Sequence, residues 1–339
     1  MFKIILTISF IVSAAVIQAA GFPLCLYEVN EAKYIKTVKK AGFNCIQTYT
    51  QNPEKIKDLA LEAQKRGVKI VVYPDKIINS PYLEEARSWP ILALYLYDEP
   101  DVNKKDNSYL KNLQNAANKA FPDKKTAFVV GKGSHAKPYY DTADILMVDW
   151  YPVPHLPLTS FGEQVKDVKN ILEEGGLPEK PVWGVVQSFD WREFKQYRPD
   201  DKRIGRFPTV EEMRFMAYDG LLEGAEGLFF FTFNSQSIPL PQSKPEHWKR
   251  LKKVAKEINK MLPVFEKGLQ TASPLEGENN LKTQRRLYKG YYYDIILNIS
   301  EGDLLLPKEF EKKKYKNLFG KNNRVVPPYT AAVLKSKAN

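Results

Sequence analysis

The chain is poor in the residues that build metal sites and disulfide frameworks. Its 339 residues include only two cysteines, Cys25 and Cys45, and three histidines. Two cysteines exclude a fold that depends on a disulfide network, even in a compartment that would permit one. Each lies in a predicted strand, and we interpret both as buried apolar residues rather than as a bonded pair. The histidines His135, His155 and His247 are isolated from one another, so we expect surface residues and no metal site.

The motifs of several large enzyme classes are also missing. The sequence has no G-x-S-x-G elbow, no G-x-G-x-x-G after a predicted strand and no phosphate-binding loop. These absences argue against acyl transfer by a serine elbow, hydride transfer from a dinucleotide and nucleotide chemistry. We therefore expect no cofactor.

Residues 1–20 have the layout of a secretory signal peptide. One basic residue precedes an apolar core, which ends in small residues with A-x-A-like spacing. We expect a mature chain that starts near Gly21 and a secreted or periplasmic protein. A retained membrane anchor is the alternative, but the apolar run is short for a span and no second one follows. Lipidation of Cys25 is disfavoured because the F-P-L before it lacks small residues.

The formal net charge is +11. Such a balance is compatible with nucleic acids or anionic surfaces as partners. However, the lysines are spread over predicted helices and turns and form no stripe with interleaved aromatics. We expect a basic, solvated exterior, which includes Arg206 and Arg214, and no nucleic-acid partner. A weaker alternative is an adhesin that binds acidic polymers in a strongly salt-dependent way.

Strand-like and helix-like runs alternate regularly through residues 21–266. A helix start is predicted at Thr209, where Glu212 completes a capping box. The predicted strands are 21–29, 41–49, 68–74, 91–97, 126–131, 144–153, 180–189 and 227–234. Eight βα units over roughly 250 residues match a TIM barrel. A doubly wound open sheet is the alternative, because the pattern does not show closure.

The rhythm changes from residue 267 to residue 339. Short β-prone runs at 291–300, 303–307 and 324–334 are separated by turn residues. The expected fold class is therefore α/β: a (β/α)8 TIM barrel over residues 21–266, followed by a small antiparallel, sandwich-like β domain over residues 267–339.

Carboxylates end the fourth predicted strand. Ile91 to Tyr97 is an unbroken apolar and aromatic run, which Asp98, Glu99 and Pro100 follow. Such a run is typical of a buried parallel strand, and ligands of barrel enzymes meet the carboxyl ends of the strands. Alternatively, Asp98 caps the next turn and Glu99 is a solvated loop acid.

The other strand ends are rich in aromatics, acids and amides, which together suit a sugar-binding cleft. Glycoside hydrolysis uses two carboxyl groups across the scissile bond. Besides Asp98 and Glu99, the candidate acids are Asp149 and Asp190. The candidate substrate contacts are Tyr27, Tyr49, Trp150, Tyr151, Gln187, Trp191 and Asn234. Tyr95, Tyr97 and residues 229–231 are assigned to the core instead.

Several segments resemble the barrel glycoside hydrolases of clan A and their secreted relatives. They are A-G-F-N at 41–44, A-Q-K-R-G-V-K-I-V-V at 63–72, Y-D-E-P-D at 97–101, D-W-Y-P-V at 149–153 and E-G-A-E-G-L-F-F-F at 223–231. The resemblance implies a carbohydrate substrate and hydrolysis of its O-glycosidic bonds. It also implies that Glu99, at the position of the Glu in the clan's N-E-P segment, is the general acid/base.

Two positions depart from the clan's pattern. Asp98 replaces the asparagine before the acid, and Gln187 stands where the clan has its nucleophilic Glu at the end of strand seven. Three explanations remain open. Another carboxylate, Asp149, Asp190 or Asp98, takes the second role; the substrate's own acetamido group attacks; or the protein is a carbohydrate-binding pseudoenzyme.

Overall fold

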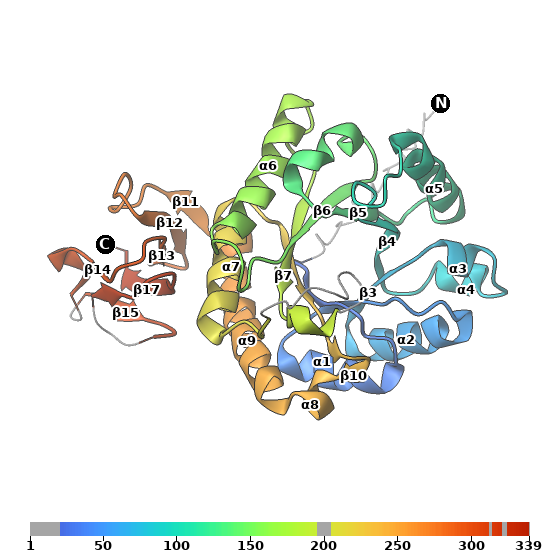
Figure 1. The fold of residues 1–339 in the computed structure, drawn as a ribbon, viewed down its shortest axis with the longest axis horizontal. Coiled ribbons are helices and arrows are strands. Elements are labelled where there is room, and N and C mark those ends of the chain that lie inside the picture. Colours follow the sequence, from blue (N-terminus) through green and yellow to red (C-terminus); the bar gives the residue numbers. More distant parts are fainter. Residues whose placement is uncertain (1–20, 195–204, 312–313, 321–323, 339) are drawn as a thin grey trace, which may run out of the picture.

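Eight parallel strands close into a barrel in chain order, as Figure 1 shows. The computed structural model describes residues 21–194, 205–311, 314–320 and 324–338, so the predicted signal peptide lies outside it. The strands are β1 (Leu24–Leu26), β2 (Cys45–Gln47), β3 (Lys69–Val72), β4 (Ile91–Asp98), β5 (Thr126–Val130), β6 (Ile145–Trp150), β7 (Val182–Gln187) and β8 (Gly227–Phe231). Because β1 pairs with both β2 and β8, the predicted TIM barrel is confirmed and the open sheet is excluded.

Helices cover the outside of the barrel. The longer ones are α1 (Ile35–Ala41), α2 (Pro53–Arg66), α5 (Asn107–Ala120), α6 (Ser160–Glu174), α7 (Val210–Leu222) and α9 (Pro245–Lys267). Shorter helical segments are η1 (Ala32–Tyr34), α3 (Asp75–Ile78), α4 (Leu83–Ala86), η2 (Gly133–Tyr139), η3 (Trp191–Glu193) and α8 (Leu240–Ser243). Polar caps set several starts, since Asn52 and Asp106 accept backbone N–H groups of α2 and α5. The predicted capping box of Thr209 and Glu212 begins α7.

The apolar side chains form two layers, one inside the barrel and one between strands and helices. Along β4, Ala93 and Tyr95 point inward, whereas Leu94 and Leu96 pack against the helices. Successive side chains of a strand face opposite sides, so a strand buried on both faces needs apolar residues at every position. This explains the unbroken run that begins at Ile91.

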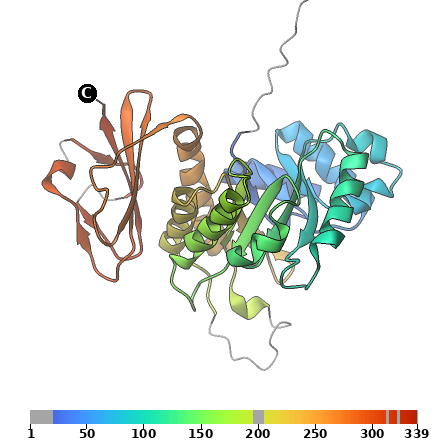
Figure 2. The same cartoon turned by 90° about the horizontal axis from the view of Figure 1, so that it is seen from above.

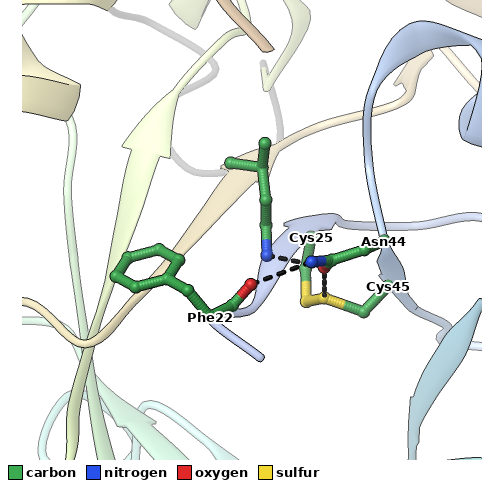
Figure 3. Close-up of a disulfide and its surroundings, with 5 residues drawn as sticks. Phe22, Cys25, Asn44 and Cys45 are labelled. Atoms are coloured by element: carbon green, nitrogen blue, oxygen red, sulfur yellow. Dashed lines mark hydrogen bonds between the residues drawn. A yellow bond between two sulfur atoms is a disulfide. The ribbon is translucent and has the colours of Figure 1, made fainter. Parts of the chain in front are cut away.

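A disulfide joins Cys25 on β1 to Cys45 on β2 inside the barrel (Figure 3). The two residues are register partners, with Cα atoms 4.4 Å apart. The interpretation of the cysteines as an unbonded pair is therefore wrong, because parallel pairing places them opposite each other and sequence spacing does not show that register. Beside the disulfide, Asn44 Oδ1 accepts the Leu24 N–H and Asn44 Nδ2 donates to the Phe22 carbonyl, both at 2.8 Å.

Removing this disulfide should lower stability without changing the fold. The bond closes a loop with a sequence separation of 20 residues. Loop-closure entropy for a loop of that length predicts a loss of about 3 kcal/mol in the free energy of unfolding. We expect a Cys25→Ala, Cys45→Ala double variant to show this loss in urea denaturation. Peptide mapping of the non-reduced wild type that finds both thiols free would contradict the assignment.

Two groups assigned to the surface by sequence are buried where α9 packs. Arg214 on α7 donates from Nε to both carboxylate oxygens of Glu257 on α9 at 2.9 Å, and the pair is almost fully buried. His247, in the first turn of α9, is 4 % exposed and its Nε2 lies 2.8 Å from the Ser188 carbonyl oxygen. Both surface predictions are wrong, because the packing of α9 against α7 and against the end of β7 covers these side chains.

The burial of His247 should make stability depend on pH. Desolvation lowers its pKa from 6.5 to about 4. Between these values the unfolded chain binds a proton that the native chain does not, so stability falls as pH drops through this window. We expect the difference in unfolding free energy between wild type and His247→Gln to change by about 3 kcal/mol from pH 7 to pH 4. His155→Gln, at an exposed site, is the control. A constant difference across this range would refute the interpretation.

The C-terminal part is antiparallel β structure that packs on α7 and α9 (Figure 2). One sheet has the order β11 (Leu269–Thr271), β12 (Leu281–Tyr288), β13 (Tyr291–Asn298), β17 (Ala331–Lys337) and β15 (Lys316–Asn317), and β14 (Leu304–Leu305) pairs with β16 (Val325–Val326). Ile295 and Val333 join the core of the barrel domain, whereas Ile296 and Leu334 belong to a separate small core. The predicted β domain is confirmed. No helix in the described part of the chain is long and apolar enough to span a membrane.

Candidate active site

A cavity of about 310 Å³ opens at the carboxyl ends of the barrel strands. It contains three of the four predicted acids, Asp98, Glu99 and Asp149, but not Asp190. The full lining is Tyr27, Tyr49, Asp98, Glu99, Val102, Gly131, Asp149, Tyr151, Phe189, Trp191, Phe194 and Phe231. Of the predicted substrate contacts, four line it and three, Trp150, Gln187 and Asn234, do not. The structure thus brings together most, not all, of the predicted site.

A bulge at the end of β4 turns Asp98 into this cavity. Tyr95 pairs with Ala127, but Asp98 pairs with Val129, so β4 contains one residue more than β5 between these two pairs. Bulges of this kind re-aim side chains next to functional sites. Strict alternation from Tyr95 would point Tyr97 inward. The bulge instead leaves Tyr97 packed outside the barrel and aims Asp98 at the cavity.

Tyrosine hydroxyls hold the Asp98 carboxylate. Tyr95 donates to Oδ1 at 2.6 Å and Tyr49 to Oδ2 at 3.4 Å, while the Tyr27 hydroxyl lies 3.3 Å from that of Tyr95. Burial raises the pKa of Asp98, and the two hydroxyl donors oppose this shift because they stabilise the anion. Asp98 is therefore fixed in position as an acceptor.

Glu99 reaches the cavity through an unusual backbone conformation. Its φ is 49°, in the left-handed region that few non-glycine residues adopt, and Asn103 Nδ2 donates to the Asp98 and Glu99 carbonyls at 3.0 Å. Gly131 on the neighbouring loop leaves space for the carboxyl. A Cβ atom there would lie 3.3 Å from Glu99 Oε1 and 2.8 Å from Val102 Cγ2.

The carboxyls of Glu99 and Asp149 line the same cavity and influence each other's protonation. Burial raises the pKa of Glu99 and the negative charge of Asp98 raises it further, whereas the interaction with Asp149 lowers it. The pKa of Asp149 is well above its ordinary value, first because of burial and then because of the charges of Glu99 and Asp98. Asp149 Oδ2 also accepts from the Tyr151 hydroxyl at 3.1 Å. Burial and like charge thus favour the protonated form of this pair, and the two groups titrate together.

The remaining predicted site residues have structural partners outside the cavity. Asp190 caps η3 and pairs with Arg192 at 2.6 Å. Trp150 donates to Ser160 Oγ at 2.9 Å, and Asn234 donates to the Glu28 carbonyl at 2.9 Å.

Gln187 is fully buried and works as a clamp between loops. Its Oε1 accepts the Val153 N–H at 2.8 Å, and its Nε2 donates to the carbonyls of Val153 at 2.9 Å and Phe189 at 3.3 Å. This pattern uses both the donor and the acceptor of the amide. A carboxylate would meet two carbonyl oxygens without a donor.

Phe189, Trp191, Phe194 and Phe231 form the aromatic wall of the cavity. The Phe231 ring is stacked with that of Tyr151 at 5.7 Å between centroids, and Phe189 and Trp191 are 5.0 Å apart.

Some lining residues were not chosen as candidates from the sequence. Phe231 was assigned to the core, and Phe189 and Gly131 were not singled out, although all three lie at or near the ends of predicted strands. Val102 and Phe194 had no such signal, because their approach depends on how the loops fold.

No group of three or more His, Cys, Asp or Glu side chains in the described ranges is arranged to hold a metal ion. The three acids of the cavity have raised pKa values, and acid–base chemistry is a property that this arrangement supports.

Neither a family model nor a curated protein matches the sequence. Solved structures do match. A glycoside hydrolase family 5 protein from Bacteroides vulgatus has a TM-score of 0.63 at 12 % identity and covers 94 % of this chain and 89 % of its own. An alpha-amylase from Geobacillus thermoleovorans has a TM-score of 0.55 at 11 % identity, with 94 % and 98 % covered, and a GH30 endoxylanase from Clostridium papyrosolvens has 0.54 at 9 %, with 94 % and 96 % covered.

The chain has the fold of these glycoside hydrolases. The resemblance to barrel glycoside hydrolases is therefore confirmed at the level of the fold. At such low identity the likeness carries no residue of the site across.

The clamp predicts that a carboxylate at position 187 harms the protein. Gln187→Glu removes the donor to Val153 and Phe189 and buries a charge, so we expect a loss of about 1–3 kcal/mol in the free energy of unfolding. We also expect no gain in hydrolysis. Thermal unfolding and a glycan panel measure both, with Gln51→Glu at an exposed site as control. A stable variant with new or higher turnover would show that position 187 is a vacant nucleophile site.

Proposed function

We propose that the protein is a secreted glycoside hydrolase that cleaves O-glycosidic bonds of a polysaccharide or glycan. The observation that carries the proposal is that one cavity holds the buried carboxyls of Glu99 and Asp149 beside the tyrosine-bound Asp98. The pKa of all three is raised, but two hydroxyl donors oppose the shift of Asp98. Carboxyl groups in different environments of one site are the usual sign of separate acid and base roles.

Glu99 is the proposed general acid/base. A general acid must hold its proton near the working pH. Burial and the charge of Asp98 raise the pKa of Glu99, and the interaction with Asp149 opposes this shift. Asp149 would act as a positioning residue, because its buried carboxyl interacts directly with that of Glu99.

Asp98 is the proposed second carboxylate, as nucleophile or as base for water. The hydroxyls of Tyr95 and Tyr49 favour its ionised form. Asp190 is less suited because its oxygens are occupied by Arg192 and by the backbone of η3.

The disulfide supports export. Disulfides persist in oxidising compartments and are rare in the cytosol. A bond between Cys25 and Cys45 is therefore consistent with the leader-like residues 1–20 and with a secreted or periplasmic protein.

A carbohydrate-binding protein without turnover is the second candidate. It is favoured by the lack of a strand-seven carboxylate among the described residues that line the cavity. The aromatic wall would serve this function equally well, so turnover separates the two.

Replacing the acid should change catalysis in a way that depends on the leaving group. We expect Glu99→Gln to bind glycans almost as wild type does and to lower their turnover by a factor of about 10²–10⁴. Activated aryl glycosides should be impaired less, because their leaving groups need little protonation. Steady-state kinetics on natural and aryl substrates measure the effect.

The matched control is Glu31→Gln, an exposed acid outside the cavity. Cleavage of natural glycan by Glu99→Gln at the wild-type rate would remove Glu99 from the mechanism. A wild type that binds glycans but cleaves none across a broad panel would favour the second candidate.

A further inference from the structure

We propose that the cavity selects a sugar with a free, protonated amine, that is, an amino sugar rather than a neutral, acetamido or acidic one. The inference rests on the proposed function, since it names the substrate class of the same site. Three properties of the lining carry it: its charge, its hydrogen-bond inventory and one unpartnered oxygen.

The first property is an uncompensated negative charge. Three carboxyls, Asp98, Glu99 and Asp149, lie in the cavity, and the lining within the described ranges includes no Lys, Arg or His. Two tyrosine hydroxyls donate to Asp98 and favour its anion, so the cavity keeps negative charge that no cationic side chain of the described lining offsets. A buried charge is costly unless it is paired, so a cationic ligand group is favoured and an acidic sugar is repelled.

The second property is an excess of acceptors over donors. The hydroxyls of Tyr49 and Tyr151 already donate to Asp98 and Asp149, and Trp191 Nε1 donates to the Tyr151 carbonyl. An ammonium group offers three donors and has no acceptor atom that would need a donor from the protein, which suits this lining. An acetamido carbonyl needs a donor, and the donors named here are engaged.

The third property is the state of Asp149 Oδ1. Asp149 is only 8 % exposed and lines the cavity, yet this oxygen has no hydrogen-bond partner. A ligand ammonium would supply a donor and favour the ionised form of Asp149. A proton would then be left to Glu99, where a general acid needs it.

The aromatic wall completes the fit. Phe189, Trp191 and Phe231 lie in the same cavity as the three acids. Aromatic faces bind the apolar side of a sugar ring and attract a cation within about 6 Å of the ring centroid. A cavity of about 310 Å³ thus places aromatic surface and negative charge around one ligand.

The test compares three β-1,4-linked tetrasaccharides that differ only at carbon 2: the glucosamine, N-acetylglucosamine and glucose tetramers. The corresponding monosaccharides and glucuronate are measured alongside, because they probe the charge class without the linkage. Calorimetry uses the full chain with Glu99→Gln, which prevents turnover, at about pH 6, where such amines are protonated. We expect the amine-bearing probes to bind about 10- to 100-fold more tightly than their matched neutral and acetamido partners.

Two variants connect this preference to the acids. Asp98→Asn and Asp149→Asn keep the side-chain shape and should each reduce the amine preference about tenfold. Asp75→Asn, at an exposed acid after β3, should retain it. Near-UV circular dichroism confirms that each variant is folded.

The proposal is overturned if no amine-bearing probe binds more tightly than its partners, whether the other probes bind or not. The proposal is also overturned if Asp98→Asn and Asp149→Asn prefer the amine-bearing probes as strongly as the protein without these substitutions does. Failure of the proposed function looks different, because wild type would then cleave no glycan in the panel. If wild type cleaves neutral glycans but shows no preference for amines, the proposed hydrolase function is supported and only the amino-sugar inference is wrong.

Discussion

The contact between the Glu99 and Asp149 carboxyls is the interaction on which the candidate site depends. It joins β4 to β6 across β5, and it exists only because the barrel curves these strand ends toward a common mouth. The bulge after Tyr95, the left-handed backbone of Glu99 and the missing side chain of Gly131 each allow the carboxyls to meet. Burial and like charge raise the pKa of Asp149 and Glu99, so the site favours protonated carboxyls that can take part in acid–base chemistry.

Different strands supply the acidic and the aromatic residues of the cavity. Acids come from the ends of β4 and β6, while the aromatic wall comes from the loop after β7 and the end of β8. This division gives a bound sugar two different faces to meet, one that exchanges protons and one that packs on a ring. The engaged tyrosine hydroxyls make the acidic side rigid and rich in acceptors, which is why the nature of the ligand's donors matters.

Several contacts outside the cavity connect the elements that form it or lie behind it. The disulfide links β1 to β2, and Gln187 ties the end of β7 to the loop after β6. On the far side of α7, Lys282 of β12 pairs with the buried Asp219 at 2.7 Å and connects the C-terminal sheet to the helix layer. These contacts lie outside the cavity, so their contribution is to hold its walls at fixed separations.

The sequence by itself determined the alternation of elements, the eight strands and most residues that end at the mouth. Apolar periodicity and caps are local properties, and a local pattern such as the run before Asp98 is enough to specify them. It did not reveal β12, whose alternation of Lys282, Gln284 and Arg286 carries little apolar signal.

Only the tertiary structure decided which strand-end residues form the site. Strand register decides that Cys25 pairs with Cys45 and that the bulge directs Asp98 into the cavity. Loop packing decides that Gln187 and Asp190 bind partners outside the cavity. Contacts between residues far apart in the chain are set by how strands close and loops fold over them, and no single segment contains that information. The sequence therefore indicated which polar and aromatic residues end the strands, and the closed barrel determined which of them line one cavity.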